Sequence, residues 1–267
     1  MTPSGVITLL TDFGTTDAYV GIMKGVIAAI HPEARVIDLT HAVPPQHVLA
    51  GALLLRSAVD VFPPGTIHVG VVDPGVGSAR QPLLVETDAG WLIGPDNGLL
   101  WPAAQRLRLR TIRLLENREF FRHPVSQTFH GRDIFAPSAA HVCRGVEPSR
   151  VGHVLERMVE LSAPAVERTS SGLSGEVVYV DRFGNLVTNI EAEMLAGFPA
   201  QQVSVSIWGM HVAGPVAAYT SVPEGAPLAI VGSWGMLEVA VRNGSAAEVF
   251  ATGPGAPVTV VVQSGGA

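Results

Sequence analysis

The sequence has little of the chemistry that several classes of protein require. Cys143 is its only cysteine, so neither an intrachain disulfide nor a cluster of thiolate metal ligands can form. Lys24 is its only lysine and lies in an apolar helical pattern, which argues against Schiff-base or Walker-lysine chemistry. No apolar run reaches membrane-spanning length, and the first residues lack a signal-peptide pattern. We therefore expect a cytoplasmic protein without a membrane partner.

Charge is also sparse. Charged residues make up 15% of the 267 residues, and the net charge is −6. The densest basic segment, 106–110, alternates arginine with leucine as the polar face of a strand would, so no nucleic-acid partner is expected. Hydrophobic residues reach 47%, enough to build a sizeable core. The length allows one large domain or two modest ones.

The N-terminal half alternates between strand and helix patterns. Apolar runs of strand length are followed by helical periodicity, which indicates an α/β domain with a mostly parallel sheet covered by helices, over residues 1–165. The expected elements are a strand at 5–11, a helix capped by Thr16 or Asp17 and ending near 30, a strand at 35–39, a helix at 46–61, a strand at 66–72, a hairpin at 83–86 and 91–94, and a helix at 133–145.

The pattern changes near residues 163–175, where Pro, Ser, Thr and Gly concentrate. We expect a linker at 166–174 and a smaller all-β domain at 175–267, built as a barrel or a sandwich. Its expected strands are 176–180, 203–208, 228–231, 237–241 and 258–262.

The segment 71–80 is the most informative local pattern. Asp73 follows an apolar strand, a turn containing proline and two glycines comes next, and Arg80 lies seven residues after the acid. Chemistry in α/β proteins gathers at such strand ends, where an acid and a guanidinium together can hold a small anion or a polarised water. A surface turn with a solvated ion pair fits the same residues. Asp12 ends another strand, so the two acids are expected to line one crevice.

The same positions have structural interpretations. Asp12 can accept hydrogen bonds from a ribose diol, or it can be a turn or cap residue. Asp17 can contact a ligand amine or cap a helix. His130 lies before a helix beside a glycine, but a lone histidine is often structural. No histidine pair has the spacing of a zinc site on a helix. Asp12, Asp73 and His130 could together hold a metal, but no motif supports one, so we expect no metal and no cofactor.

Two C-terminal turns complete the candidates. The segment 181–189 is interpreted as a polar turn between strands, with amide side chains suited to a base edge. The segments 232–235 and 242–244 form a second candidate, although ordinary hairpin turns would explain them equally well.

Taken together, six motifs in this order resemble S-adenosylmethionine (SAM) hydrolases that form adenosine, the SAM hydroxide adenosyltransferases, which are related to SAM-dependent fluorinases and chlorinases. The resemblance covers nearly the whole chain. The motifs are LTDFGTTD (10–17), VDPGVG (72–77), GPDNGLL (94–100), FHGRD (129–133), DRFGN (181–185) and RN (242–243).

The resemblance implies a role for each matching residue. Asp73, Arg80 and His130 would be the catalytic set, and Asp12 would hold the ribose diol. The methionine end of SAM would meet Asp17, Asp181 and Ser233, and adenine would be surrounded by Phe183, Asn185, Asn243 and Gly244. The resemblance also implies an α/β domain, a β-barrel domain, and a homotrimer that binds SAM between neighbouring subunits.

The implied reaction is attack of water on the ribose C5′ of SAM, giving adenosine and methionine. Arg80 would orient the water, and its proton would pass either to His130, held and polarised by Asp73, or directly to Asp73. The related halogenases resemble this chain less closely, because a tyrosine takes the place of Asp73 there and fluorinases carry a long insertion between Arg80 and Trp91. A halogenase or a non-catalytic trimer that binds SAM or adenosine are the alternatives.

Overall fold

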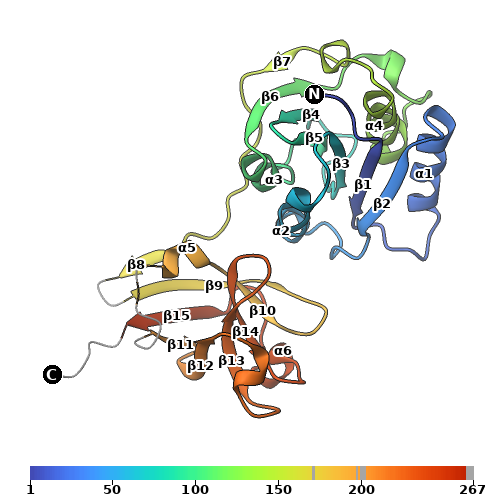
Figure 1. The fold of residues 1–267 in the computed structure, drawn as a ribbon. Coiled ribbons are helices and arrows are strands. Elements are labelled where there is room, and N and C mark those ends of the chain that lie inside the picture. The colour runs from blue at the N-terminus through green and yellow to red at the C-terminus, as the bar shows by residue number, and fades with distance from the viewer. Residues whose placement is uncertain (170–171, 197, 199–202, 263–267) are drawn as a thin grey trace. The chain divides into compact units, whose positions relative to one another are not determined.

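The computed structural model describes residues 1–169, 172–196, 198 and 203–262. The chain divides into two compact units, Met1–Ser162 and Ala163–Ala267 (Figure 1). Each unit has its own apolar core. No helix among the described residues has both the length and the apolar character needed to cross a membrane.

The N-terminal unit is built on a seven-stranded mixed sheet with the strand order β2-β1-β3-β5-β4-β6-β7. Its strands are β1 (Val6–Thr11), β2 (Arg35–Thr40), β3 (Thr66–Val71), β4 (Pro82–Thr87), β5 (Gly90–Pro95), β6 (Leu109–Leu114) and β7 (Val154–Leu155). The pairs joining β2, β1, β3 and β5 are parallel, and those joining β5, β4, β6 and β7 are antiparallel.

The expectation of a mostly parallel sheet is therefore correct for only half of it. The strand–helix alternation of residues 5–72 produces the parallel half, as helical crossovers require. The tight connection between β4 and β5 forces an antiparallel hairpin, as the sequence predicted, and β6 then pairs antiparallel on the other edge of β4. A tight hairpin can join only antiparallel neighbours, so the short connection explains the direction of the β4–β5 pair.

Helices cover both faces of this sheet (Figure 1). They are α1 (Tyr19–Ile30), α2 (Val48–Ala58), α3 (Trp101–Arg106) and α4 (Ala136–Cys143), with 3₁₀ turns at Val59–Val61, Arg118–Phe120 and Pro148–Arg150. Helix α1 packs against α4, and α2 packs against α3. Met23 of α1 lies in one core with Ile7 and Leu9 of β1 and with Phe135. Helix α4 extends a five-residue π-helix, Gly131–Phe135.

Two local expectations are wrong. The cap of α1 is Ala18, and no side chain caps the helix, because residues after Asp12 form a loop at the end of β1 rather than entering the helix at Thr16 or Asp17. The segment 106–110 was expected to lie on one strand. Instead Arg106 is the last residue of α3 and β6 begins at Leu109, so the alternation of arginine and leucine runs from the end of a helix into a strand.

The C-terminal unit is a closed β-barrel. Seven strands form the ring β9-β10-β14-β13-β12-β11-β15, which closes where β15 pairs with β9, and β8 adds to β9. The strands are β8 (Glu167–Thr169), β9 (Gly172–Val180), β10 (Leu186–Glu191), β11 (Val203–Ile207), β12 (Met210–Val216), β13 (Pro227–Val231), β14 (Met236–Val241) and β15 (Pro257–Val262), with short helices α5 (Ala192–Leu195) and α6 (Ala246–Val249) and a 3₁₀ turn at Tyr219–Ser221.

Three details of the barrel differ from the sequence expectations. The described residues of the expected linker, 166–174, contain β8 and the first residues of β9, which pair with each other. Strand β10 contains the last four of the nine residues that were interpreted as one polar turn, 186–189, because its Thr188 and Asn189 hide an apolar alternation. Strand β12 was not among the expected strands, because its Gly214 and Pro215 interrupt the strand pattern in the sequence.

The core of the N-terminal unit should be sensitive to acid through His68. This buried residue on β3 shares a 2.9 Å hydrogen bond between Nδ1 and Thr8 Oγ1, and burial lowers its pKa from 6.5 to about 4. Below pH 6.5, His68 is protonated in the unfolded chain, whereas in the folded chain it stays neutral until the pH approaches 4. The free energy of unfolding should therefore fall across that window, by about 2 kcal/mol at pH 5.

Urea unfolding of the wild type and of His68→Asn, followed by circular dichroism at pH 7.5 and pH 5, tests this. The asparagine does not titrate, so the wild type should lose about 2 kcal/mol relative to the variant at the lower pH. A difference between the two proteins that is the same at both pH values would contradict the assignment.

Candidate functional site

Asp73 and Arg80 form a buried ion pair at the carboxyl end of β3. The Nε of Arg80 donates to both carboxylate oxygens of Asp73 at 3.0 Å, and Nη2 donates to Oδ2 as well. Their side chains are only 5% and 9% exposed, respectively, so the interpretation as a solvated surface pair is wrong. The bidentate geometry fixes both groups in orientation as well as in charge.

The guanidinium of Arg80 also joins this loop to His130. Its Nη2 lies 2.7 Å from His130 Nδ1, on the residue that precedes the π-helix. The Cζ of Arg80 lies 5.3 Å from the centre of the Phe135 ring. Gly77, in the same loop, has φ +78°, and a Cβ there would lie 2.4 Å from the carbonyl oxygen of Gln127. Only glycine therefore lets the loop approach the 127–130 segment this closely.

This contact determines the protonation state of His130. A guanidinium has no acceptor atom, so Nδ1 of His130 must accept and its proton must sit on Nε2. Burial first, and the charge of Arg80 second, lower the pKa of His130, which keeps the ring neutral. We expected Asp73 to hold and polarise His130 directly. In the structure Arg80 lies between them, because its Nη2 contacts both Asp73 Oδ2 and His130 Nδ1.

A cavity of about 410 Å³ lies against this cluster. Asp12, Asp73 and His130 line it together, as expected for acids at the ends of neighbouring strands. Asp12 Oδ2 accepts from the backbone N–H of Gln46 at 2.8 Å, while its Oδ1 accepts no hydrogen bond from the described residues. One carboxylate oxygen of Asp12 is thus available to a ligand.

Three aromatic rings line the same cavity. Phe13 lies 5.8 Å from Tyr19 and 5.9 Å from Phe129, and Tyr19 lies 5.2 Å from Phe129, measured between ring centroids. Tilted and edge-on rings of this kind present π faces that attract cations. Asp17, in contrast, is exposed and does not line the cavity, so the N-terminal unit alone does not bring it to the other site residues.

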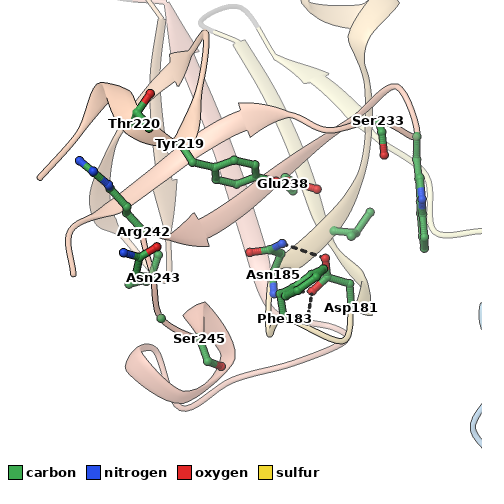
Figure 2. Close-up of a pocket in the computed structure, with 14 residues that line it drawn as sticks. Asp181, Phe183, Asn185, Tyr219, Thr220, Ser233, Glu238, Arg242, Asn243 and Ser245 are labelled. Atoms are coloured by element: carbon green, nitrogen blue, oxygen red, sulfur yellow. Dashed lines mark hydrogen bonds between the residues drawn. The ribbon is translucent and has the colours of Figure 1, made fainter. Parts of the chain in front are cut away.

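The barrel has a second cavity, of about 760 Å³ (Figure 2). All six residues that the resemblance placed in this unit line it: Asp181, Phe183, Asn185, Ser233, Asn243 and Gly244. Phe183 is 77% exposed, and so offers a ring face to a ligand. Asn243 has φ +57° at the turn after β14, and its Nδ2 donates to Glu224.

Asp181 organises the turn that carries these residues. Its Oδ1 accepts from the backbone N–H groups of Phe183 and Asn185 at 2.8 and 2.9 Å, and its Oδ2 accepts from Asn185 Nδ2 at 2.8 Å (Figure 2). One N–H of the Asn185 amide is used in this bond, which orients the group and leaves its side-chain oxygen as an acceptor for a ligand. Asp181 thus shapes the turn, whatever else it contacts.

Sequence reasoning missed two residues in this cavity, Tyr219 and Glu238. The Tyr219 hydroxyl donates to Glu238 Oε1, and Glu238 is only 7% exposed. Burial, followed by the charge of Asp181, raises the pKa of Glu238. A signal existed in the sequence, because Glu238 is the only charged residue in the otherwise apolar strand 236–241.

Within the part of the chain that the structure describes, no three His, Cys, Asp or Glu side chains are grouped as a metal site.

Comparison with known proteins adds the family. Residues 7–152 match the model of the SAM hydroxide adenosyltransferase N-terminal domain, and residues 175–259 match that of the C-terminal domain. The chain belongs to the SAM hydroxide adenosyltransferase family.

Individual members of the family are similar over their full length. An (R)-S-adenosyl-L-methionine hydrolase of Salinispora tropica is 40% identical over 96% of this chain and 97% of its own, and one of Thermus thermophilus is 40% identical over 94% and 98%. A crystal structure of a conserved protein from Thermotoga maritima superposes with a TM-score of 0.90 at 37% identity, over 96% of this chain and 99% of the other. A fluorinase of Actinoplanes sp. is more distant, 27% identical over 69% of this chain and 71% of its own.

For this member of the SAM hydroxide adenosyltransferase family, the bridging role of Arg80 predicts a change at His130. Replacing Arg80 by Gln removes the cation that lowers the pKa of His130 and leaves the attraction of Asp73 and Asp133, which raises it. The pKa of His130 in Arg80→Gln should therefore be higher than in the wild type.

Titration of the histidine ring protons by NMR measures this, with His130→Asn used to assign the resonance among the nine histidines. Arg132→Gln is the matched control, because Arg132 pairs with Asp133 and makes no hydrogen bond to His130. An unchanged or lower pKa of His130 in Arg80→Gln would refute the bridge.

Proposed function

We propose that this protein hydrolyses SAM to adenosine and L-methionine by attack of water on the ribose C5′, without a cofactor. The observation that carries the proposal is the hydrogen-bonded Asp73–Arg80–His130 cluster on the wall of a cavity that Asp12 also lines. The 40% identity of this chain to two relatives that are named (R)-S-adenosyl-L-methionine hydrolase supports the substrate.

The leaving group explains why the site needs no strong acid. As the water oxygen bonds to C5′, the C5′–S bond breaks and its electron pair moves to sulfur, so methionine leaves as a neutral thioether. The attacking water becomes an alkyl oxonium, which is strongly acidic, and an ordinary carboxylate is then a sufficient acceptor for its proton. The main barrier is alignment of a weak nucleophile, which positioning can lower by up to ~7–11 kcal/mol in well-oriented cases.

The hydrogen bonds favour Asp73 as the proton acceptor. His130 Nδ1 is occupied by Arg80, and its Nε2 carries the proton, so a neutral His130 can donate to the water oxygen but has no free base nitrogen. Asp73 Oδ2 accepts from both Nε and Nη2 of Arg80, whereas Oδ1 accepts only from Nε and keeps a second lone pair for a proton. Arg80 fixes Asp73 in the orientation from which it can receive the proton.

We assign the different parts of SAM to the residues that line the two cavities. We assign the ribose diol to Asp12 and the sulfonium to the aromatic faces of Phe13, Tyr19 and Phe129, which suit a cation. Adenine is assigned to the barrel cavity, with Phe183 stacking and the Asn185 oxygen, Asn243 and Gly244 at its edge. Asp17, Asp181 and Ser233 are assigned to the methionine end.

We further propose a homotrimer in which SAM lies between the N-terminal unit of one subunit and the C-terminal unit of its neighbour. This assembly would give Asp17, exposed in the N-terminal unit, a ligand to contact. It would also unite groups that each unit holds separately: acids and a histidine in one, and base-recognising amides in the other.

A halogenase is the weaker candidate. A halide approaching C5′ would meet the carboxylate of Asp73 on the cavity wall, and like charges repel in a site of low polarity. A neutral water has no such penalty and gains an acceptor for its proton.

The purified protein should convert SAM to adenosine in ¹⁸O-labelled water, with the label in the 5′-hydroxyl of adenosine and none in methionine. Because the relatives are named for the (R)-epimer, we expect faster turnover of SAM with (R) configuration at sulfur. Separated epimers, chromatography and mass spectrometry measure both results.

A parallel incubation with chloride is the control for the alternatives. Formation of 5′-chloro-5′-deoxyadenosine in place of adenosine would support a halogenase. Binding of SAM without any product would support a non-catalytic SAM-binding protein. Either result would overturn the hydrolase proposal.

A further inference from the structure

Glu238 is a buried acid that lines the barrel cavity. None of the roles inferred from the sequence involves it. It lies on β14, its side chain is more than nine-tenths buried, and Figure 2 shows it among the residues that line the cavity. A Cβ on Gly232 would lie 2.3 Å from Glu238 Oε2, so the glycine provides the space that the carboxylate occupies. A buried carboxylate is costly unless hydrogen bonds or a cation compensate it.

The compensation within the barrel is incomplete. Glu238 Oε1 accepts the Tyr219 hydroxyl, but Oε2 accepts no hydrogen bond from the described residues, and Glu238 has no ion pair with any of them. Arg242 lines the same cavity, yet its Nη1 donates to the Val222 carbonyl at 2.8 Å, and its guanidinium points away from Glu238 in Figure 2. The other charge facing Glu238 is Asp181, which is also negative.

Asp181 is poorly placed to be the main acidic contact for a ligand. Three N–H groups of its own turn already donate to its carboxylate. Glu238 Oε2 is thus the least satisfied carboxylate oxygen in the cavity. The Ser233 hydroxyl, a further acceptor, lines the same cavity. A cavity of this kind calls for a cation that brings several N–H donors.

SAM carries two cations of different chemistry. The sulfonium has no N–H group, whereas the α-ammonium has three donors. We propose that Glu238, held in place by Tyr219, binds the α-ammonium group of the methionine part of SAM. The inference rests on the proposed function and adds a specificity determinant to it: Glu238 distinguishes adenosyl ligands that carry an amino acid from those that do not.

The test is calorimetric binding of two stable probes to the full-length protein. S-adenosyl-L-homocysteine carries the α-ammonium without the sulfonium, and 5′-methylthioadenosine lacks the amino acid. Glu238→Gln should weaken S-adenosyl-L-homocysteine about tenfold or more and leave 5′-methylthioadenosine unchanged, since only the charged hydrogen bond is lost. Tyr219→Phe, which removes one hydroxyl, should weaken the same probe selectively and less. Glu248→Gln, outside the cavity on α6, is the matched control and should change neither affinity.

Equal weakening of both probes by Glu238→Gln would assign Glu238 to the adenosyl part or to the fold and overturn the inference, as would no change with either probe. In both cases, binding of the probes by the wild type leaves the proposed function standing. A wild type that binds neither probe would overturn the proposed function and this inference with it.

Discussion

The guanidinium of Arg80 is the group on which the arrangement of the N-terminal cavity depends. It joins two segments that lie fifty residues apart, the turn after β3 and the start of the π-helix, through Asp73 and His130. The surrounding fold supports this bridge in two ways. Phe135 lies under the guanidinium, and Gly77 lets the loop approach the backbone at Gln127. Without the bridge, the buried carboxylate of Asp73 and the partly buried ring of His130 would lose their common partner.

The bridge also decides which chemistry each member can perform. Because a guanidinium only donates, it fixes the proton of His130 on Nε2 and leaves Asp73 Oδ1 as the acceptor with a spare lone pair. In the mechanism that we propose, His130 is therefore a donor that orients the water, and Asp73 is the acceptor of its proton. This division of tasks suits a reaction whose leaving group needs no proton and whose nucleophile must lose one.

The positions of Asp12 and Asp73 could be predicted because uninterrupted apolar runs identify β1 and β3, and parallel neighbours bring their ends together. The burial of the Asp73–Arg80 pair could not, since it depends on Phe135 and His130, whose packing no local pattern reveals. His130 and the barrel residues were placed by motif resemblance rather than by physics. Glu238 was missed because its partner Tyr219 is nineteen residues away, across a turn and strand β13. The short connection between β4 and β5 predicted their antiparallel pairing, but the antiparallel pairing of β6 and β7 has no such local signal, because long connections precede both strands.

The central claim is that Asp73, and not His130, accepts the proton of the attacking water. The most direct measurement compares kcat for SAM hydrolysis in Asp73→Asn and His130→Asn, with SAM affinity measured in parallel. In His130→Asn the amide oxygen can still accept from Arg80 in place of Nδ1. The account predicts that Asp73→Asn loses about 10²-fold or more in kcat, as expected for removal of a general base, and that His130→Asn loses at least about tenfold less. A loss in His130→Asn equal to or greater than that in Asp73→Asn would contradict it.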